Sequence, residues 1–146
     1  MEKRDRIVAA ARGWIGTPYR HQASLKNVGC DCLGLVRGVW REIEGAEPET
    51  PPAYSADWAE SGGTEALAEA GFRHLQAVPD KKFQRGDIVL FRWRDHLPAK
   101  HAGLIVDQHV MIHAQDGVAV CEVPLSRWWR ARIAFVFQFP NIPSVM

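Results

Sequence analysis

Cys32 is the residue of this 146-residue chain whose surroundings best suit covalent chemistry. It follows Asp31 directly, and apolar residues recur after it with the spacing of a helix that has one buried face. These positions are Leu35, Val36, Val39, Trp40 and Ile43. Aspartate is a preferred N-cap, so Cys32 is expected in the first helical turn, where the positive end of the helix dipole favours a thiolate.

Two histidines could supply the base that such a thiol needs. In segments 101–106 and 110–115 the even positions are apolar, while the odd positions include His101, Gly103 and His113. With a three-residue loop at 107–109, strand alternation places both rings on one face of a hairpin. His101 would then take the proton of Cys32, lowering the pKa of the thiol, and His113 would hold the His101 ring in the correct tautomer.

The pattern of the remaining chain predicts the elements that position these side chains. Helices are expected at 3–15, ended by Gly16; at 32 to about 45; and at 64–70, capped by Thr64 and stopped by Gly71. Residues 72–85 are expected to be mostly loop. Strands are expected at 87–93, 101–106, 110–114, 118–123 and 133–139. Helices followed by an antiparallel meander indicate an α+β fold with the helices on one face of the sheet, in a single domain of residues 1–146.

Composition excludes several classes of protein. A hydrophobic content of 47% argues against a disordered chain, and a net charge of +1 gives no reason to expect nucleic acid as a partner. The mixed Arg and Trp clusters at 92–94 and 127–132 are interpreted as the solvated rim of an aromatic groove. No apolar run reaches the about 20 residues that span a membrane, so no membrane insertion is expected. The charged N-terminus does not resemble a signal peptide, which predicts synthesis in the cytoplasm without an export signal.

The three cysteines do not form a disulfide framework, because their number is odd and a Cys-x-Cys bridge would be strained. We interpret Cys121 as a packing residue. An alternative is that Cys30, Cys32, His101 and His113 hold zinc in a structural module. Two ligands one residue apart rarely face the same ion, and a cap at Asp31 places Cys30 outside the helix. No metal and no cofactor are therefore expected.

Several motifs in a fixed order resemble the NlpC/P60 cysteine peptidases, which are papain-like cell-wall hydrolases. They are Thr-Pro-Tyr at 17–19, Asp-Cys-Leu-Gly-Leu-Val at 31–36, Gly-Asp-Ile-Val-Leu-Phe at 86–91, His-Ala-Gly-Leu-Ile-Val at 101–106 and Met-Ile-His-Ala at 111–114. The flanking Gly-Trp-Ile-Gly at 13–16, the Cys-Asp-Cys at 30–32 and the Arg-Trp-Trp-Arg at 127–130 are more similar to the compact members found with the tail modules of phages and gene transfer agents.

The resemblance implies a thiol protease with Cys32 as nucleophile, His101 as base and His113 as the third polar residue. Tyr19 corresponds to the family's conserved tyrosine and, with the Cys32 amide, would bind the oxyanion beside the Asp31 cap. The implied substrate is an amide bond of a peptidoglycan stem peptide, between D-γ-glutamate and a diamino acid, cut for cell wall degradation by a tail-associated protein. Phage or gene-transfer-agent tail proteins are the implied partners.

Two departures from the family pattern lie where substrate is expected. Leu33 stands where serine commonly follows the nucleophile, and residues 21–24 (His-Gln-Ala-Ser) replace a Gly-Gly pair. A non-catalytic tail module on the same fold, and an amidase or acyltransferase that uses the same Cys–His pair, therefore remain alternatives.

Overall fold

The computed structural model describes residues 1–49, 51 and 65–143, which form a six-stranded antiparallel sheet with helices on one face. The helices are α1 (Lys3–Arg12), α2 (Cys32–Ile43), α4 (Ala66–His74) and the short α5 (Arg127–Arg130), with a 3-10 turn, η1 (Pro79–Lys81). The strands are β1 (Ser24–Leu25), β2 (Gly29–Cys30), β3 (Gln76–Ala77), β4 (Ile88–Phe91), β5 (His101–Ile105), β6 (Val110–Gln115), β7 (Val118–Pro124) and β8 (Ile133–Gln138).

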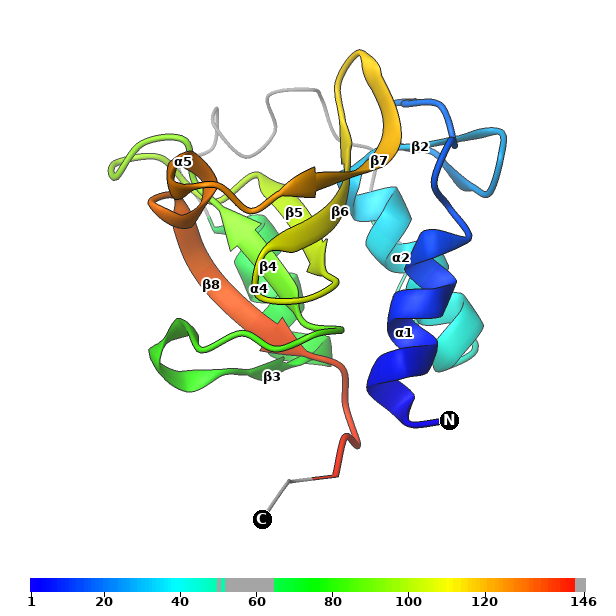
Figure 1. Ribbon diagram of the computed structural model, residues 1–146, viewed down its shortest axis with the longest axis horizontal. Helices are drawn as coiled ribbons and strands as arrows, with labels where there is room; N and C mark the ends of the chain where they lie inside the picture. The colour runs from blue at the N-terminus through cyan, green and yellow to red at the C-terminus, as the bar shows by residue number, and fades with distance from the viewer. Residues whose placement is uncertain (50, 52–64, 144–146) are drawn as a thin grey trace.

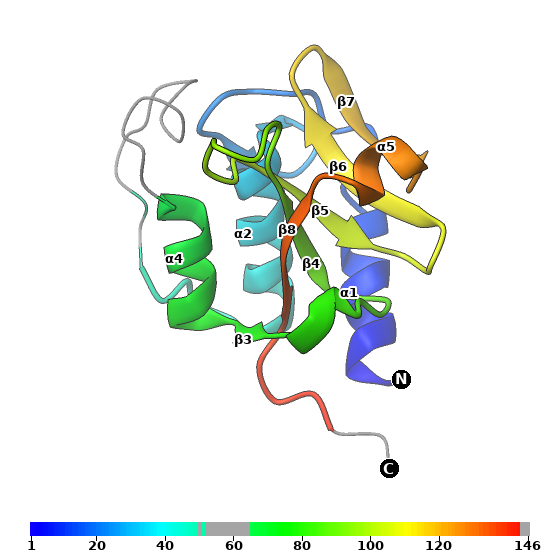
Figure 2. The same ribbon diagram turned by 90° about the vertical axis from the view of Figure 1, so that its left-hand side faces the viewer.

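The main sheet has the order β3-β8-β4-β5-β6-β7, with antiparallel neighbours throughout, so the C-terminal strand β8 inserts between β3 and β4 (Figure 1). The helices α4, α2 and α1 lie side by side on one face of this sheet (Figure 2). This arrangement confirms the predicted α+β order and the antiparallel meander. In the described ranges no helix is long and apolar enough to cross a membrane.

The sheet separates two apolar clusters because strand side chains alternate between its faces. Ala102, Leu104 and Ile112 point toward the helices and join the larger cluster, with Leu35 and Val39 of α2. The second cluster lies on the opposite face and contains Phe91, Ile105, Met111, Leu125 and Val136, with Trp129 packed against it. The even-numbered positions of the hairpin therefore face the helices, as the alternation predicted.

The predicted C-terminal end of the third helix, at residue 70, is wrong. Gly71 does not stop it: α4 continues to His74, and Gly71 is a buried residue inside it. A Cβ at this position would lie 2.6 Å from the Phe137 ring, so glycine is required here for close packing on β8 rather than for a turn. The expected cap, Thr64, lies outside the described residues, and Glu65 is the N-cap of α4 as observed. Residues 72–85 contain β3 and η1 after the helix ends.

The first helix is also shorter than predicted, because residues 13–16 turn away after Arg12, with Gly16 at a positive φ of 92°. The Trp14 side chain turns back beneath α2, where a Cβ on Gly38 would lie 1.9 Å from its indole ring. Its indole N–H donates to Glu42 at 2.7 Å. This contact fixes α2 against the N-terminal segment.

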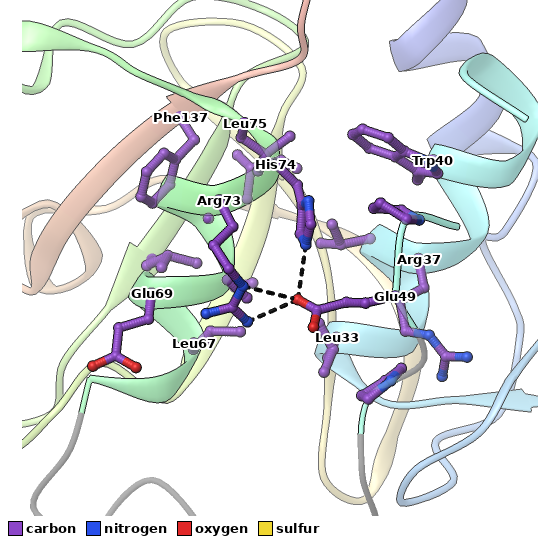
Figure 3. A pocket seen from close by; sticks show the side chains of 18 of the residues that line it. Leu33, Arg37, Trp40, Glu49, Leu67, Glu69, Arg73, His74, Leu75 and Phe137 are labelled. Atoms are coloured by element: carbon purple, nitrogen blue, oxygen red, sulfur yellow. Dashed lines mark hydrogen bonds and ion pairs between the residues drawn. The ribbon is translucent and has the colours of Figure 1, made fainter. Parts of the chain in front are cut away.

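A cavity of about 320 Å³ remains between α2, α4 and the sheet (Figure 3). Its wall is mostly apolar and includes Leu33, Leu67 and Phe137. At its mouth the Glu49 carboxylate accepts hydrogen bonds from Arg73 at 2.7 Å and from His74 at 2.8 Å. Leu33 follows Cys32 in the chain, so one end of this cavity lies behind the first turn of α2.

Candidate active site

Cys32 begins α2, and Asp31 caps the helix as predicted. The Asp31 carboxylate is buried, and it accepts the Gly34 amide at 2.7 Å and the Gln22 amide at 2.8 Å. The second bond joins the cap to the loop that precedes β1. Asp31 therefore has a positioning role, because its oxygens fix the first turn that carries the thiol.

The Cys32 sulfur is half-buried against the beginning of β5. It donates to the carbonyl oxygen of Lys100 at 3.8 Å and accepts a hydrogen bond from the Ala102 amide. The backbone amide of Ile105 donates to the Asp87 carbonyl, on the side of β5 that faces β4. Because backbone amides point to alternate sides along a strand, the Ala102 amide points to the side that faces β6. The β5–β6 pairing runs through Leu104 and Ile105. The sulfur therefore lies at the open end between these two strands.

His101 and His113 lie on the same sheet face and contact each other, which confirms the predicted arrangement of the hairpin. His101 Nε2 lies 2.9 Å from His113 Nδ1, and the ring planes are nearly perpendicular at 82°. Only 5% of His101 and 2% of His113 is exposed. Such a bond fixes the ring orientation and leaves Nδ1 of His101 as the ring nitrogen available to a second partner.

The structure brings the sulfur to the main chain on either side of His101, not into a hydrogen bond with its ring. Within the described ranges the sulfur bonds to the Lys100 carbonyl and to the amides of Ala102 and Leu33, and no hydrogen bond joins it to the imidazole. Catalytic hydrogen bonds are often long or poorly aligned before substrate binds.

Tryptophans cover the histidine pair, a feature that the sequence interpretation missed. The rings of Trp93 and Trp129 stack on His101 with centroid distances of 5.6 Å and 5.5 Å. Trp129 also meets His113 edge-on at 5.3 Å. The sequence predicts the Arg and Trp clusters as the solvated rim of an aromatic groove, whereas Trp93 and Trp129 are half-buried against the histidines. The signal in the sequence was alternation: Phe91 pairs with His101 across the ladder, so Trp93 continues the same face.

Burial sets the charge state of the site and overturns one expectation. It raises the pKa of the Cys32 thiol to about 12, with Asp31 as a second cause. It lowers the pKa of His101 to about 3, assisted by His113 and Lys100, and the pKa of His113 to about 4. At neutral pH the Cys32 thiol and both imidazoles are therefore neutral, and the thiolate that the helix dipole alone favours does not form.

Tyr19 lies within electrostatic reach of Cys32 and keeps its proton. Its backbone forms an isolated bridge with Cys30, and burial together with the charges of Asp31 and Cys32 raises the pKa of its phenol to about 12. The hydroxyl is therefore a hydrogen-bond donor at any physiological pH.

The four residues of the zinc alternative do not converge. Cys30 is fully buried in the larger apolar cluster, away from the histidine face. Across residues 1–49, 51 and 65–143, no group of three or more His, Cys, Asp or Glu side chains is arranged to hold a metal ion. The third cysteine, Cys121, is half-buried on β7 and pairs with His113 across the ladder.

Comparison with protein families matches residues 16–137 to the NlpC/P60 family. Among curated proteins, the chain is 23% identical over 121 residues to the tail tip assembly protein K of Escherichia phage N15, a match of 77% of this chain and 46% of that protein. It is 25% identical over 137 residues to the gamma-DL-glutamyl hydrolase of Bacillus subtilis, covering 93% of this chain and 29% of that protein. The chain thus spans less than half the length of these relatives.

Solved structures agree on the fold. The NlpC/p60 domain of the peptidoglycan hydrolase SagA superposes with a TM-score of 0.66 at 20% identity, covering 93% of this chain and 98% of that one. RipD from Mycobacterium tuberculosis, described as a non-catalytic NlpC/p60 domain protein adapted to peptidoglycan binding, superposes with a TM-score of 0.62 at 12% identity, covering 94% and 98%. Identities this low show a shared fold only.

Proposed function

Because this chain belongs to the NlpC/P60 family, a family of peptidoglycan hydrolases, we propose that it is a cysteine peptidase that hydrolyses an amide bond of a peptidoglycan stem peptide. Within the single domain of residues 1–146, Cys32 is the nucleophile, His101 the base and His113 the residue that orients it. Tyr19 and the Cys32 amide bind the oxyanion, and the reaction needs no cofactor.

The reaction begins when the Cys32 sulfur attacks the substrate carbonyl and its proton passes to Nδ1 of His101. The carbonyl oxygen becomes an oxyanion. Two donors can meet it: the protonated Tyr19 hydroxyl, and the Cys32 amide, which has no intrahelical acceptor in the first turn of α2. The imidazolium then gives its proton to the leaving nitrogen as the C–N bond breaks. Water, deprotonated by His101, finally cleaves the thioester and restores the thiol.

The neutral resting site fits this sequence of steps. A base with a pKa of about 3 and a thiol with a pKa of about 12 do not exchange a proton in the free protein. Proton transfer must accompany bond formation, when the negative charge moves from sulfur to the oxyanion and its donors. His113 supports the step because its bond to Nε2 holds the ring while positive charge develops.

One observation carries the proposal above the others. Asp31 fixes Cys32 at the start of α2, and the sulfur lies on the strand end that bears His101, which is itself bonded to His113 at 2.9 Å. These contacts support a thiol, a base and an orienting group drawn from α2, β5 and β6, the combination that a nucleophilic cysteine site requires.

The D-γ-glutamyl–diamino acid bond is our proposed cleavage site, supported by the similarity to a protein named gamma-DL-glutamyl hydrolase. The similarity to a tail tip assembly protein supports a place in a phage or gene-transfer-agent tail, where the activity would open the cell wall. The proposed partners are accordingly stem peptides and tail proteins.

Two other functions are compatible with the same site. RipD shows that this fold can bind peptidoglycan without catalysis, and Leu33 in place of the usual serine is the feature of this chain that favours such a role. Acyl transfer would use the same thioester with an amine in place of water. Both are outcomes of the test below.

The test is digestion of purified stem peptides, free and attached to glycan, with products identified by mass spectrometry. We expect cleavage between D-glutamate and the diamino acid, complete loss of cleavage in Cys32→Ala, and a trapped thioester in acid-quenched wild-type reactions. Cys121→Ala is the matched control, because Cys121 is also a half-buried free thiol, and it should cleave normally.

Each alternative leaves a different result. Binding of stem peptides without any cleavage would show a non-catalytic module, and products that carry an added amine would show acyl transfer. Cleavage that survives in Cys32→Ala would remove Cys32 from the reaction and overturn the mechanism.

A further inference from the structure

The indole of Trp129 lies against both histidines of the candidate site at once. It stacks on His101 with an interplanar angle of 28° and meets His113 edge-on at 89°. The two imidazoles are themselves nearly perpendicular, at 82°. One rigid plane can satisfy both contacts only when the imidazoles keep this mutual orientation. The indole is therefore shaped to the hydrogen-bonded pair and not to either ring alone.

Trp93 covers the same rings from the segment that follows β4. Its ring stacks on His101 at 5.6 Å with an angle of 26°, and it meets Trp129 at 5.8 Å. Phe91 lies 5.9 Å from His101 and 4.9 Å from Trp129. Three aromatic rings thus contact the His101 ring: Phe91 of β4, Trp93 just after β4, and Trp129 of α5. A rotation of the imidazole would therefore displace packed neighbours.

We propose that Trp129, assisted by Trp93, is a positioning residue that holds the imidazole of His101 in the plane in which it bonds His113 and presents its other nitrogen to the Cys32 thiol. The ring contacts stand on the structure alone, and the consequence for catalysis rests on the proposed function.

The same rings keep water from the imidazole. Trp93 and Trp129 are each only half-buried, so they cover His101 at the surface and leave it 5% exposed. The titratable or charged groups that act on the pKa of His101 are His113 on β6 and Lys100, which directly precedes β5. Neither of these is an anion at neutral pH, so neither opposes the deprotonated form of the ring.

Trp128 provides a matched control within the same helical turn. Its ring contacts Trp93 and Trp129, and its outer side is covered by the Arg132 guanidinium at 3.8 Å. It makes no ring contact with either histidine among the described residues, and half of it (49%) is exposed. A role that depends on touching the imidazoles should therefore distinguish the two neighbouring tryptophans.

The experiment compares Trp129→Ala, Trp129→Phe and Trp128→Ala in the full chain. The pH titration of His101 is followed by NMR, and the pH profile of Cys32 alkylation by iodoacetamide is measured beside that of stem-peptide hydrolysis. In Trp129→Ala we expect His101 to titrate at least about one pH unit closer to the ~6.5 of a solvated histidine. The acidic limb of the hydrolysis profile should move to higher pH by the same amount as the His101 titration, with KM little changed.

Trp129→Phe keeps an aromatic ring against the imidazoles and should recover most of the wild-type titration, while Trp128→Ala should leave it unshifted. If Trp129→Ala does not fold, as judged by circular dichroism, Trp129→Leu replaces it with apolar bulk that lacks the flat ring. An unshifted His101 titration in folded Trp129→Ala or Trp129→Leu, or an equal shift in Trp128→Ala, would overturn the inference. If wild type cuts no stem peptide, the NMR titration still decides the positioning role while the proposed function fails separately.

Discussion

At the scale of single residues, the charged group of the candidate site positions the helix that carries the thiol, and the groups proposed to react are neutral. Asp31 is the anion nearest the thiol, yet its oxygens are taken by the Gly34 and Gln22 amides of the cap. The groups assigned to the reaction, Cys32, His101 and Tyr19, are all neutral at pH 7 because burial opposes their charged forms. Substitutions at these positions should therefore change rates more than substrate binding.

Tyr19→Phe tests the oxyanion assignment. The variant keeps the ring and loses only the hydroxyl, so kcat for stem-peptide hydrolysis should fall about 10²- to 10³-fold, the usual cost of removing one oxyanion donor. KM should change little, since the bond forms in the transition state. Steady-state kinetics measure both constants. A fall in kcat/KM of the same size that comes entirely from a higher KM, with kcat unchanged, would instead make Tyr19 a substrate-binding residue.

His113→Ala tests the orienting bond. His101 would lose its Nε2 partner, and we expect kcat to fall about 10²-fold or more, within the range of general acid–base effects. His113→Gln, which can still reach the ring with a polar group, should recover part of the rate. The control is His109→Ala, because His109 is exposed in the β5–β6 loop. A His113→Ala protein with the wild-type rate would exclude an orienting role.

At the scale of elements, the packing of α4 on β8 depends on a residue without a side chain. Gly71→Ala would gain about 0.5–1 kcal/mol of helix propensity. The added Cβ would lie 2.6 Å from the fully buried Phe137 ring, and overpacking of this kind costs about 1–3 kcal/mol. We expect net destabilisation, measured by urea unfolding.

Glu69→Ala, at an exposed position of the same helix, should change the free energy of unfolding by no more than about 0.5 kcal/mol. A Gly71→Ala protein more stable than wild type would mean that Phe137 moves aside freely.

The elements that the sequence predicted well are those whose pattern is local. The apolar spacing after Cys32 and the alternation around residues 107–109 gave α2 and the β5–β6 hairpin, and with them the histidine contact. The end of α4 and the tryptophan cover were not predicted, because both depend on contacts between distant segments. A glycine at position 71 is the residue type expected at a helix end, and only its packing on Phe137 explains why it lies inside α4. The shifted pKa of Cys32 likewise depends on burial that no local pattern reveals.

At the scale of the whole molecule, stability should depend on pH through the buried histidines. In the unfolded chain they titrate near 6.5, whereas in the folded protein the pKa of His101 is about 3 and that of His113 about 4. Between pH 6.5 and pH 5 the unfolded chain therefore binds more protons. The free energy of unfolding should fall as pH falls, by up to about 1.4 kcal/mol per pH unit for each histidine.

Above pH 9 the free energy of unfolding should fall as pH rises, because the pKa of Cys30 and Cys32 is about 12 in the folded protein and the unfolded thiols lose their protons first. Stability should thus be greatest between about pH 6.5 and pH 9. Urea unfolding measured from about pH 5 to about pH 10 tests both slopes. Replacing both His101 and His113 by Gln should flatten the acidic slope, while His109→Gln should leave it intact. Equal stability of wild type at pH 5 and pH 7 would contradict the assigned burial.

The placement of the sulfur at the open end of β5 and β6 has a consequence for biosynthesis. Cys32 leaves the ribosome well before the strands that carry its two imidazoles, so a nascent chain ending within α4 bears an ordinary cysteine. The proposed reactive centre is complete only when the C-terminal half has folded against α2.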